Sequence, residues 1–476
     1  MHQAPETIFR HFTWQLAVLL CFLDFYLEPL GFRFGALELS CLLGFALFVV
    51  QIWQKRVDTV HPFFRTNAFR FFRTALFLWL FYAIGRFVWN YVQPFNPAEY
   101  ALSNAVKSEF SVTAIILLMW LFSFRPRDIT VKRGFSTIVA SLLLIGLYVN
   151  IAIRLYGIAE GIFENPSTND IDSALFIPFL NMSENPYSLR FAGPIAVLYG
   201  LTFLTSPRTR WPITWRIRLL YYGLILGGFF GAAISGARAS LLFALGLCIL
   251  ILMVRRKFVA MALLAMLAFI GFGLLNVFSQ KIASDPSLAP VQRSLYWAMM
   301  DQAEWAGTSI DSSTRWRQEL FHRAIDEWKS DSMIFWFGRG TYKYTDEDRD
   351  AIEMNGFEGL MDTSLRRGAT HNLVSDLLIT YGVVGLALYF VVCIALIRLC
   401  FKVATDRGLP EDVTNLGVIS AIAAVFTVGY GVIAGDFIKL YEGWFVVMIL
   451  ARIAQSAFES TKGIVKEAPI LNIVKG

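Results

Sequence analysis

The strongest constraint on this chain is a series of hydrophobic runs, each long enough to cross a lipid bilayer. A helix needs about 20 predominantly apolar residues to span the hydrocarbon core. Only 16% of the residues are charged and 56% are hydrophobic, whereas soluble domains carry about 25% charged residues. The sequence therefore predicts an all-α, polytopic integral membrane protein with about twelve transmembrane helices. We place these helices at residues 12–30, 34–53, 70–92, 109–124, 135–157, 190–206, 217–235, 238–254, 258–279, 372–397, 413–435 and 440–457.

The charges between these runs predict the orientation, because cytoplasmic loops are enriched in Lys and Arg. With the N-terminus in the cytoplasm, the short outside loops carry only Arg33, Lys107, Arg238 and Lys439. The inside loops carry the larger set: Lys55, Arg56, Arg65, Arg70, Arg73, Arg125, Arg127, Lys132, Arg133, Arg208, Arg210, Arg216, Arg218, Arg255, Arg256, Lys257, Arg398, Lys402 and Arg407. This strict alternation favours twelve spans with both termini in the cytoplasm.

The basic balance of the chain has the same explanation. A net charge of +6 follows from the inside loops, and no module with interleaved basic and aromatic residues is present, so we expect no nucleic-acid partner. Membrane lipids are the expected surroundings. The first run, 12–30, carries Asp24 and Glu28 near its end and no small-x-small cleavage site, so we interpret it as a span and not as a signal peptide.

The sequence predicts neither a metal site nor a structural disulfide. All five cysteines lie in hydrophobic runs, at Cys21, Cys41, Cys248, Cys393 and Cys400, and no pair has ligand spacing. The Asp170-Ile171-Asp172 triplet is only a weak metal candidate, and Asp346-Glu347-Asp348 is typical of a solvated acidic turn.

Two outside segments are too long to be simple connections, and loops of such length are usually functional. Residues 158–189 are acidic and rich in Asn and Pro, and residues 280–371 form the largest polar insert. The predicted organisation is therefore as follows: transmembrane helices 1–9 in 1–279, an outside helical loop in 280–371, transmembrane helices 10–12 in 372–457, and a cytoplasmic tail in 458–476.

The 280–371 segment contains the pattern of an amphipathic helix. An apolar set recurs every four residues and consists of Trp316, Leu320, Ala324 and Trp328. A polar set with spacing i, i+4, i+7 and i+11 forms a stripe and consists of Arg315, Glu319, His322 and Asp326. This spacing predicts a helix that begins near a cap at Asp311 or Ser312.

Three residues on the outside could carry chemistry. Arg238 follows the tight reversal Ser235-Gly236-Ala237, Arg315 lies on the amphipathic helix, and His371 opens the tenth span. A guanidinium suits a phosphate or carboxylate, and an imidazole can act as a general base near neutral pH. Alternatively, Arg238 is a snorkelling arginine at the bilayer edge and Arg315 is an ordinary surface arginine. His371 is then a structural histidine at the membrane interface.

Four further arginines are secondary candidates. Arg86 and Arg154 fall in the outer halves of the third and fifth spans, where an ionisable residue suggests function; the alternative is pairing with Asp24, Glu28 or Glu38. Arg366 and Arg367 precede His371 and could lower its pKa or share phosphate binding. No Walker A, Gly-x-Ser-x-Gly or His-Glu-x-x-His motif is present, and no Asp-x-Asp pair ends the first outside loop.

Three motifs together resemble the bacterial O-antigen ligase and O-antigen polymerase superfamily. The first is the small-Gly-x-Arg reversal Ser235-Gly236-Ala237-Arg238. The second is Ser313-Thr314-Arg315 followed by a helix and Gly338-Arg339-Gly340. The third is His371-Asn372, which opens a span that continues Gly382-Val383-Val384-Gly385. The resemblance covers about residues 230–400, and Ala237 stands where the family often has Ser.

The resemblance implies a metal-independent, inverting glycosyltransferase of the bacterial inner (cytoplasmic) membrane with a periplasmic active site and no cofactor. It implies an undecaprenyl-diphosphate-linked glycan as donor, and lipid A–core or another glycan as acceptor. Arg238 and Arg315 would then bind the diphosphate, and His371 would be the base. Arg86, Arg154, Arg366, Arg367, His322 and Asn372 are secondary candidates.

Other functions, both within this class of enzyme and outside it, stay open. A ligase transfers O-antigen to lipid A–core, and we favour it because one compact outside loop of this size is usual there; a polymerase of O-antigen or exopolysaccharide shares the motifs. The other classes are a lipid-linked glycan flippase or secondary transporter, or a non-catalytic export subunit. A transporter should show related halves, and the sequence has none that we detect.

Overall fold

The computed structural model describes the chain over a defined set of residues, to which the statements below refer. These are 25–27, 34–35, 66–92, 135–159, 174–177, 180–183, 189–206, 214–236, 238–285, 288, 291–292, 295, 304–340, 354, 357–366, 370, 372–405 and 411–434.

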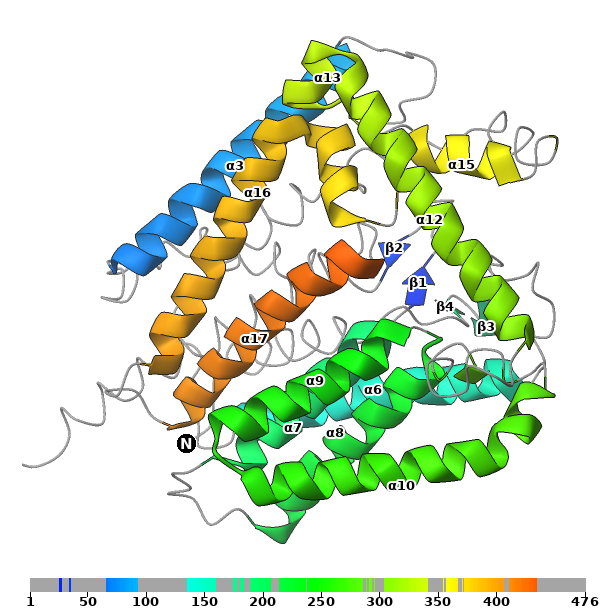
Figure 1. Cartoon of the computed structure of the whole chain (residues 1–476). Helices are drawn as coiled ribbons and strands as arrows, with labels where there is room; N and C mark the ends of the chain where they lie inside the picture. Colours follow the sequence, from blue (N-terminus) through cyan, green and yellow to red (C-terminus); the bar gives the residue numbers. More distant parts are fainter. Residues whose placement is uncertain are drawn as a thin grey trace, which may run out of the picture.

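Eight helices coincide with predicted spans (Figure 1). They are α3 (Asn67–Val92), α6 (Phe135–Ala159), α7 (Leu189–Leu204), α8 (Trp215–Ile234), α9 (Arg238–Val254), α10 (Phe258–Ala283), α16 (Leu373–Thr405) and α17 (Glu411–Ala434). Within the described residues, four helical stretches are long and apolar enough to cross a membrane: Asn67–Arg86, Thr137–Ala159, Trp215–Ile234 and Leu373–Thr405. The predicted spans 109–124 and 440–457 lie outside the described residues, so the count of twelve stays a prediction.

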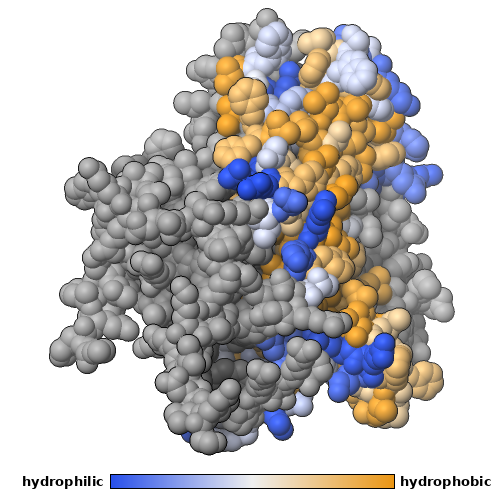
Figure 2. Space-filling model, turned by 90° about the vertical axis from the view of Figure 1, so that its left-hand side faces the viewer, coloured by the Kyte–Doolittle hydropathy of each residue, from blue (hydrophilic) through white to orange (hydrophobic). Residues whose placement is uncertain are grey.

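The outer surface of these helices is apolar. Phe81 on α3 is 82% exposed, and Val259 and Phe269 on α10 are 77% and 80% exposed. Figure 2 shows apolar side chains on the surface along much of the described part of one face. Large apolar patches are rare on soluble monomers, whereas lipid is a suitable solvent for them. The chain is therefore a membrane protein, as predicted.

A small antiparallel sheet departs from the all-α prediction. It has the order β2-β1-β4-β3, with β1 (Phe25–Leu27), β2 (Phe34–Gly35), β3 (Ala174–Ile177) and β4 (Leu180–Ser183). β1 and β2 fall at the edges of runs that we predicted as the first two spans, and β3 and β4 form a hairpin inside the 158–189 segment. Register pairs Tyr26 with Asn181, so residues far apart in sequence meet here; the prediction of helix for 25–27 and 34–35 is wrong.

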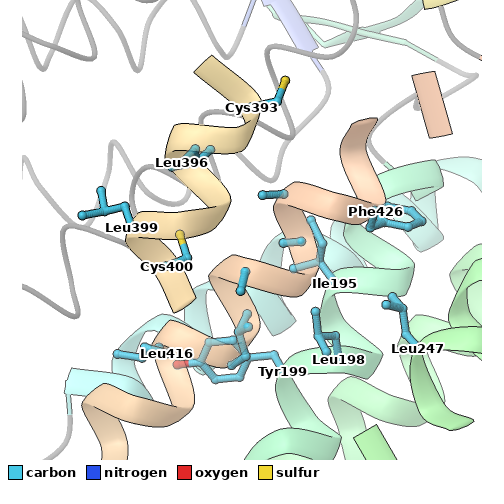
Figure 3. Packing of buried hydrophobic residues seen from close by; sticks show 14 of the residues in the cluster. Ile195, Leu198, Tyr199, Leu247, Cys393, Leu396, Leu399, Cys400, Leu416 and Phe426 are labelled. Carbon is cyan, nitrogen blue, oxygen red and sulfur yellow. The ribbon is translucent and has the colours of Figure 1, made fainter. Parts of the chain in front are cut away.

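Close packing between α7 and α8 depends on glycines. A Cβ at Gly193 would lie 2.8 Å from the Gly228 carbonyl oxygen, and a Cβ at Gly228 would meet Val197. Small residues let helix backbones approach in membranes, where van der Waals packing replaces the hydrophobic effect. The core then continues to the neighbouring helices (Figure 3), through Tyr199 on α7, Leu247 on α9, Leu396 on α16 and Phe426 on α17.

The 280–371 segment contains the helices α12 (Glu304–Ser330), α13 (Ser332–Phe337) and α15 (Phe357–Arg366). Leu320 and Ala324 are fully buried, whereas Arg315, Glu319, His322 and Asp326 are exposed, so the predicted amphipathic pattern is confirmed. The predicted start near Asp311 or Ser312 is wrong, because α12 begins at Glu304. In the view of Figure 1, α12 runs across one end of the bundle, and it contacts α16, α13 and α15.

Hydrogen bonds show which helix ends lie together. Arg154 near the end of α6 donates to the Ile234 carbonyl at the end of α8, and Ser240 at the start of α9 donates to the Arg190 carbonyl at the start of α7. We call this the reversal end, because it contains the turn between α8 and α9.

The opposite end is defined by a polar cluster of Ser206, Arg255, Glu411 and Asn415. Asn415 Nδ2 lies 3.0 Å from Ser206 Oγ, Arg255 Nη2 donates to Asn415 Oδ1 at 2.5 Å, and Ser206 donates to the Glu411 carboxylate. The ends of α7 and α9 and the start of α17 therefore meet. Burial lowers the pKa of the Arg255 guanidinium, and the Glu411 carboxylate partly opposes this.

Candidate functional site

The reversal that precedes Arg238 is held by backbone acceptors. Gly236 has φ +71, a conformation that glycine adopts without steric cost, and the Ser235 hydroxyl donates to the Ala232 carbonyl at 2.8 Å. Arg154, 3% exposed, donates from Nε to the Ile234 carbonyl oxygen at 3.0 Å. A buried guanidinium therefore satisfies a carbonyl at the end of α8, where helices leave such groups without helical partners. Arg154, a secondary candidate from the sequence, therefore has a backbone carbonyl as its partner.

Arg238 is the first residue of α9, directly after this reversal. The dipole of a helix and the free N–H groups of its first turn favour an anion near its N-terminus. The position of Arg238 therefore combines a cationic residue with a helix start at the reversal end. Its side chain lies outside the described residues.

A second glycine junction connects α13 with α16. α16 is broken at Gly382, which has φ +68 and ψ −172, and Figure 1 shows α16 as two segments that meet at a sharp bend beside α13. Gly338, with φ +71, ends α13. A Cβ at Gly338 would overlap the backbone of Thr380 and Tyr381, and a Cβ at Gly382 would overlap that of Trp336 and Phe337. The two glycines thus let two backbones touch.

Backbone hydrogen bonds complete this junction. The N–H groups of Arg339 and Gly340 donate to the carbonyls of Ile379 and Thr380, at 2.7 and 3.1 Å. These carbonyls belong to the last turn of α16 before its break, where helical donors are missing. The two glycine motifs noted in the sequence therefore bind each other, and the predicted span 372–397 is not one continuous helix.

α3 supports the same junction from the other side. The Tyr82 hydroxyl donates to the Tyr381 carbonyl at 2.5 Å, and Arg86 Nη2 donates to the Gly338 carbonyl at 2.6 Å. Trp79 makes edge contacts with the Tyr381 and Tyr389 rings, at centroid distances of 5.0 and 5.7 Å. Arg86 therefore binds backbone at the junction; Asp24, Glu28 and Glu38, which we considered as partners, lie outside the described residues.

A buried polar network fixes the residues on both sides of His371. Asp376 is fully buried, and its Oδ1 accepts from the Thr370 N–H at 2.5 Å and from the Thr370 hydroxyl at 2.6 Å. Asn372 caps α16, because its Oδ1 accepts from Val374 N at 2.9 Å and from Ser375 N at 3.4 Å. His371 itself lies outside the described residues, and its two neighbours in sequence, Thr370 and Asn372, both take part in this network.

Asp376 was not singled out from the sequence. Its available signal was an ionisable residue inside a hydrophobic run, which is uncommon and suggests function. Asn372, a secondary candidate, has the role of a helix cap.

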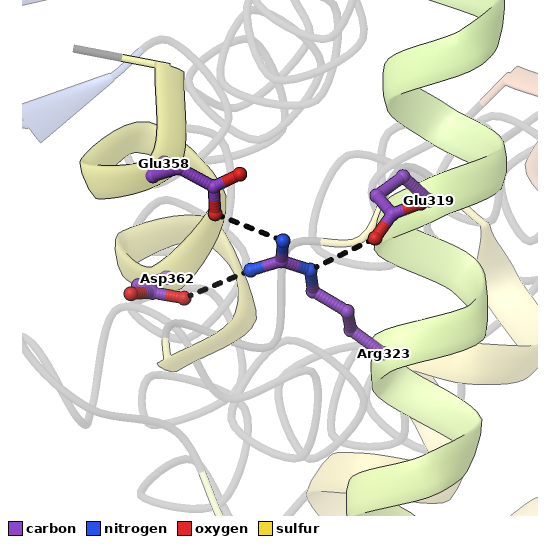
Figure 4. Close-up of polar contacts among 4 residues, drawn as sticks. All are labelled: Glu319, Arg323, Glu358 and Asp362. Atoms are coloured by element: carbon purple, nitrogen blue, oxygen red, sulfur yellow. Dashed lines mark hydrogen bonds and ion pairs between the residues drawn. The ribbon is translucent and has the colours of Figure 1, made fainter. Parts of the chain in front are cut away.

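On α12, Arg315 and His322 are exposed. Arg323, which directly follows His322 on this helix, contacts three carboxylates (Figure 4): Glu319 at 3.2 Å, Glu358 at 2.8 Å and Asp362 at 3.4 Å. The hydrogen bond that Arg323 donates to Glu319, followed by the one that it donates to Glu358, raises the pKa of Arg323, so its charge is constant in the physiological range. This cluster connects α12 with α15.

The described residues do not include the side chains of Arg238, Arg366 and Arg367, or His371. The structure therefore gives no distance between Arg315 and any of them. The structure describes the backbone next to Arg238 and next to His371 separately. The first turn of α9 lies at the reversal end, and Asn372 caps the segment of α16 that leads into the Gly338–Gly382 junction. Among the described residues, no group of three His, Cys, Asp or Glu side chains is placed to hold a metal ion.

Comparison with known proteins finds a family that part of this chain resembles. Residues 220–390 match the family model described as O-antigen ligase, and this range includes Arg238, Arg315, His371 and both glycine motifs. The match confirms the resemblance to the O-antigen ligase and polymerase superfamily. It supports a ligase- or polymerase-type function, with a lipid-linked glycan and an acceptor as partners in general. No curated protein sequence matches the chain.

Proposed function

We propose, from the O-antigen ligase match of residues 220–390, that this protein is a glycosyltransferase that takes a glycan from undecaprenyl diphosphate at the periplasmic face of the inner membrane. The acceptor is a hydroxyl of lipid A–core, which makes the protein an O-antigen ligase. The observation that carries the proposal is that one family match contains the three outside residues capable of this chemistry.

The reaction follows from the charges involved. His371 accepts the proton of the acceptor hydroxyl, and the hydroxyl oxygen attacks the anomeric carbon of the glycan. The bond between that carbon and the diphosphate oxygen breaks, and the electron pair leaves with undecaprenyl diphosphate. Arg238 and Arg315 stabilise the negative charge that develops on the leaving group. A single displacement inverts the anomeric centre.

The buried network around Thr370 supports the assignment of His371. A general base must be held within hydrogen-bond reach of the proton it accepts. Asp376 accepts hydrogen bonds from Thr370, and Asn372 caps α16, so the described residues on both sides of the histidine in sequence are held in place.

The test is a transfer assay with the purified full-length protein. Undecaprenyl-diphosphate glycan is supplied with lipid A–core, or alone, and the products are separated on a gel. Glycosylated core supports a ligase, whereas a ladder formed from donor alone would identify a polymerase. If neither product forms, and if Arg238→Ala or His371→Ala leaves surface glycan unchanged in cells, the transferase assignment is wrong.

A further inference from the structure

Arg339, between the two glycines of Gly338-Arg339-Gly340, is nearly buried, with a side chain 10% exposed. Its Nη1 pairs with the Glu327 carboxylate on α12, and its Nη2 donates to the Leu365 carbonyl near the end of α15. Its backbone N–H donates to the Ile379 carbonyl of α16 at 2.7 Å. One residue therefore contacts three separate helices.

Each of these helices leads to a residue of the proposed site. Glu327 is twelve positions after Arg315 on the same continuous helix, so a displacement of one moves the other. Leu365 is followed at once by Arg366 and Arg367 and lies six residues before His371. Ile379 belongs to the segment of α16 that begins after Asn372. Arg339 thus contacts α12, which carries the proposed diphosphate ligand Arg315. It also contacts the chain before and after the proposed base His371.

Two further contacts make the position of Arg339 well defined. The Trp328 indole donates to the Phe335 carbonyl at 3.0 Å, and the two rings stack at 4.6 Å, which fixes α12 to α13. Asp331 caps α13, accepting from Met333 N at 2.6 Å. The guanidinium is planar and presents fixed donors, so it can hold a carboxylate and a carbonyl at a set separation.

We propose that Arg339 is a positioning residue for glycan transfer: it holds α12 and the segment leading to His371 in the relative arrangement that the reaction needs. This inference rests on the proposed function, because it concerns the same site. Arg339 is not itself a ligand of the substrate, since its Nη1 and Nη2 atoms contact Glu327 and Leu365.

Arg323 provides a matched control, because it also connects α12 with α15. Its partners are 51% to 61% exposed, and exposed ion pairs contribute little to stability because water and salt screen them. The two arginines therefore join the same helices, one in a nearly buried setting and one at the surface.

The experiment compares Arg339→Met, Arg339→Lys and Arg323→Met in the full-length protein with undecaprenyl-diphosphate glycan and lipid A–core. Displacing reacting groups by about 1 Å can cost about 100-fold in rate, so we expect Arg339→Met to lower kcat by about that factor while KM for the donor changes far less. Arg339→Lys should recover part of kcat, because an ammonium can pair with Glu327. Arg323→Met should keep the wild-type kcat.

Hydrogen exchange of residues 365–372 is measured on the same samples and should be faster in Arg339→Met alone. The inference is overturned if Arg339→Met turns over like wild type, if both Met variants lose activity equally, or if activity falls only with the amount of folded protein. If the wild type transfers no glycan, the proposed function fails. Unchanged exchange in Arg339→Met would separately refute the role of Arg339 in holding this segment.

Discussion

Replacing Gly382 by alanine should open the junction between α13 and α16. Gly382 has φ +68 and ψ −172, a region that is essentially restricted to glycine and costs other residues about 1–3 kcal/mol. The added Cβ would also overlap the backbone of Trp336 and Phe337, and forcing extra volume into a packed site costs about 1–3 kcal/mol. The combined cost of about 2–6 kcal/mol is a large part of the usual 5–15 kcal/mol of folding stability.

This cost can be relieved locally, if α13 separates from α16. The hydrogen bonds from Arg339 N and Gly340 N to Ile379 and Thr380 would then be lost. We therefore expect Gly382→Ala to lower the thermal midpoint, to increase protease cleavage around residues 338–357, and to reduce glycan transfer.

The matched control is Gly271→Ala on α10, where an added Cβ meets no atom within 4 Å. In a helix interior, alanine is favoured over glycine by about 1 kcal/mol, so this variant should be neutral or slightly more stable. The reasoning is refuted if Gly382→Ala melts, resists protease and transfers glycan as the wild type does, or if both variants are affected equally.

Four further predictions concern other parts of the site. Arg154→Met removes the hydrogen bond to the Ile234 carbonyl and should lower the free energy of unfolding by about 1.5–3 kcal/mol; a denaturant series would show no change if the contact contributes nothing. Asp376→Ala should reduce transfer by up to about 100-fold, and Asp376→Asn by less because an amide oxygen still accepts from Thr370; equal rates in both variants would contradict this. Hydrogen bonds to Glu319 and Glu358 raise the pKa of Arg323, so its contribution is present below the ordinary pKa of arginine and is lost only as the pH rises through the raised value; the protection factors of α15 against hydrogen exchange should therefore stay constant from about pH 6 to about pH 9, and a transition there would count against this pairing. Transfer should survive EDTA, and its loss would implicate a metal.

Hydrophobic runs predicted most of the described helices, because the length of each run by itself indicates a helix that can span a bilayer. The run 238–254 agrees with α9 to the residue, and the alternating apolar and polar sets of α12 appear as a buried and an exposed face. Such patterns depend only on neighbouring residues, so a single sequence contains them.

The features that the sequence did not predict depend on distant partners. Gly382 lies inside one continuous hydrophobic run, so hydropathy does not show the break. Arg86 and Arg154 donate to the carbonyls of Gly338 and Ile234, and a backbone acceptor has no signature in the sequence.

The small sheet was not predicted from the sequence for the same reason. β1 pairs with β4 across about 150 residues of sequence, and its strands are too short to show a period of two. Local patterns therefore predicted the helices, whereas the long-range pairing of these few residues left no such pattern.

The most direct test of the central claim is the single-turnover rate of undecaprenyl diphosphate release by purified protein in the presence of lipid A–core. Wild type, Arg238→Ala, Arg315→Ala and His371→Ala are compared, with Gly271→Ala as the folded control. We expect release in step with glycosylation of the core in the wild type and the control, and loss of both in the three site variants. Wild-type release rates in the His371→Ala and Arg238→Ala proteins would contradict the account.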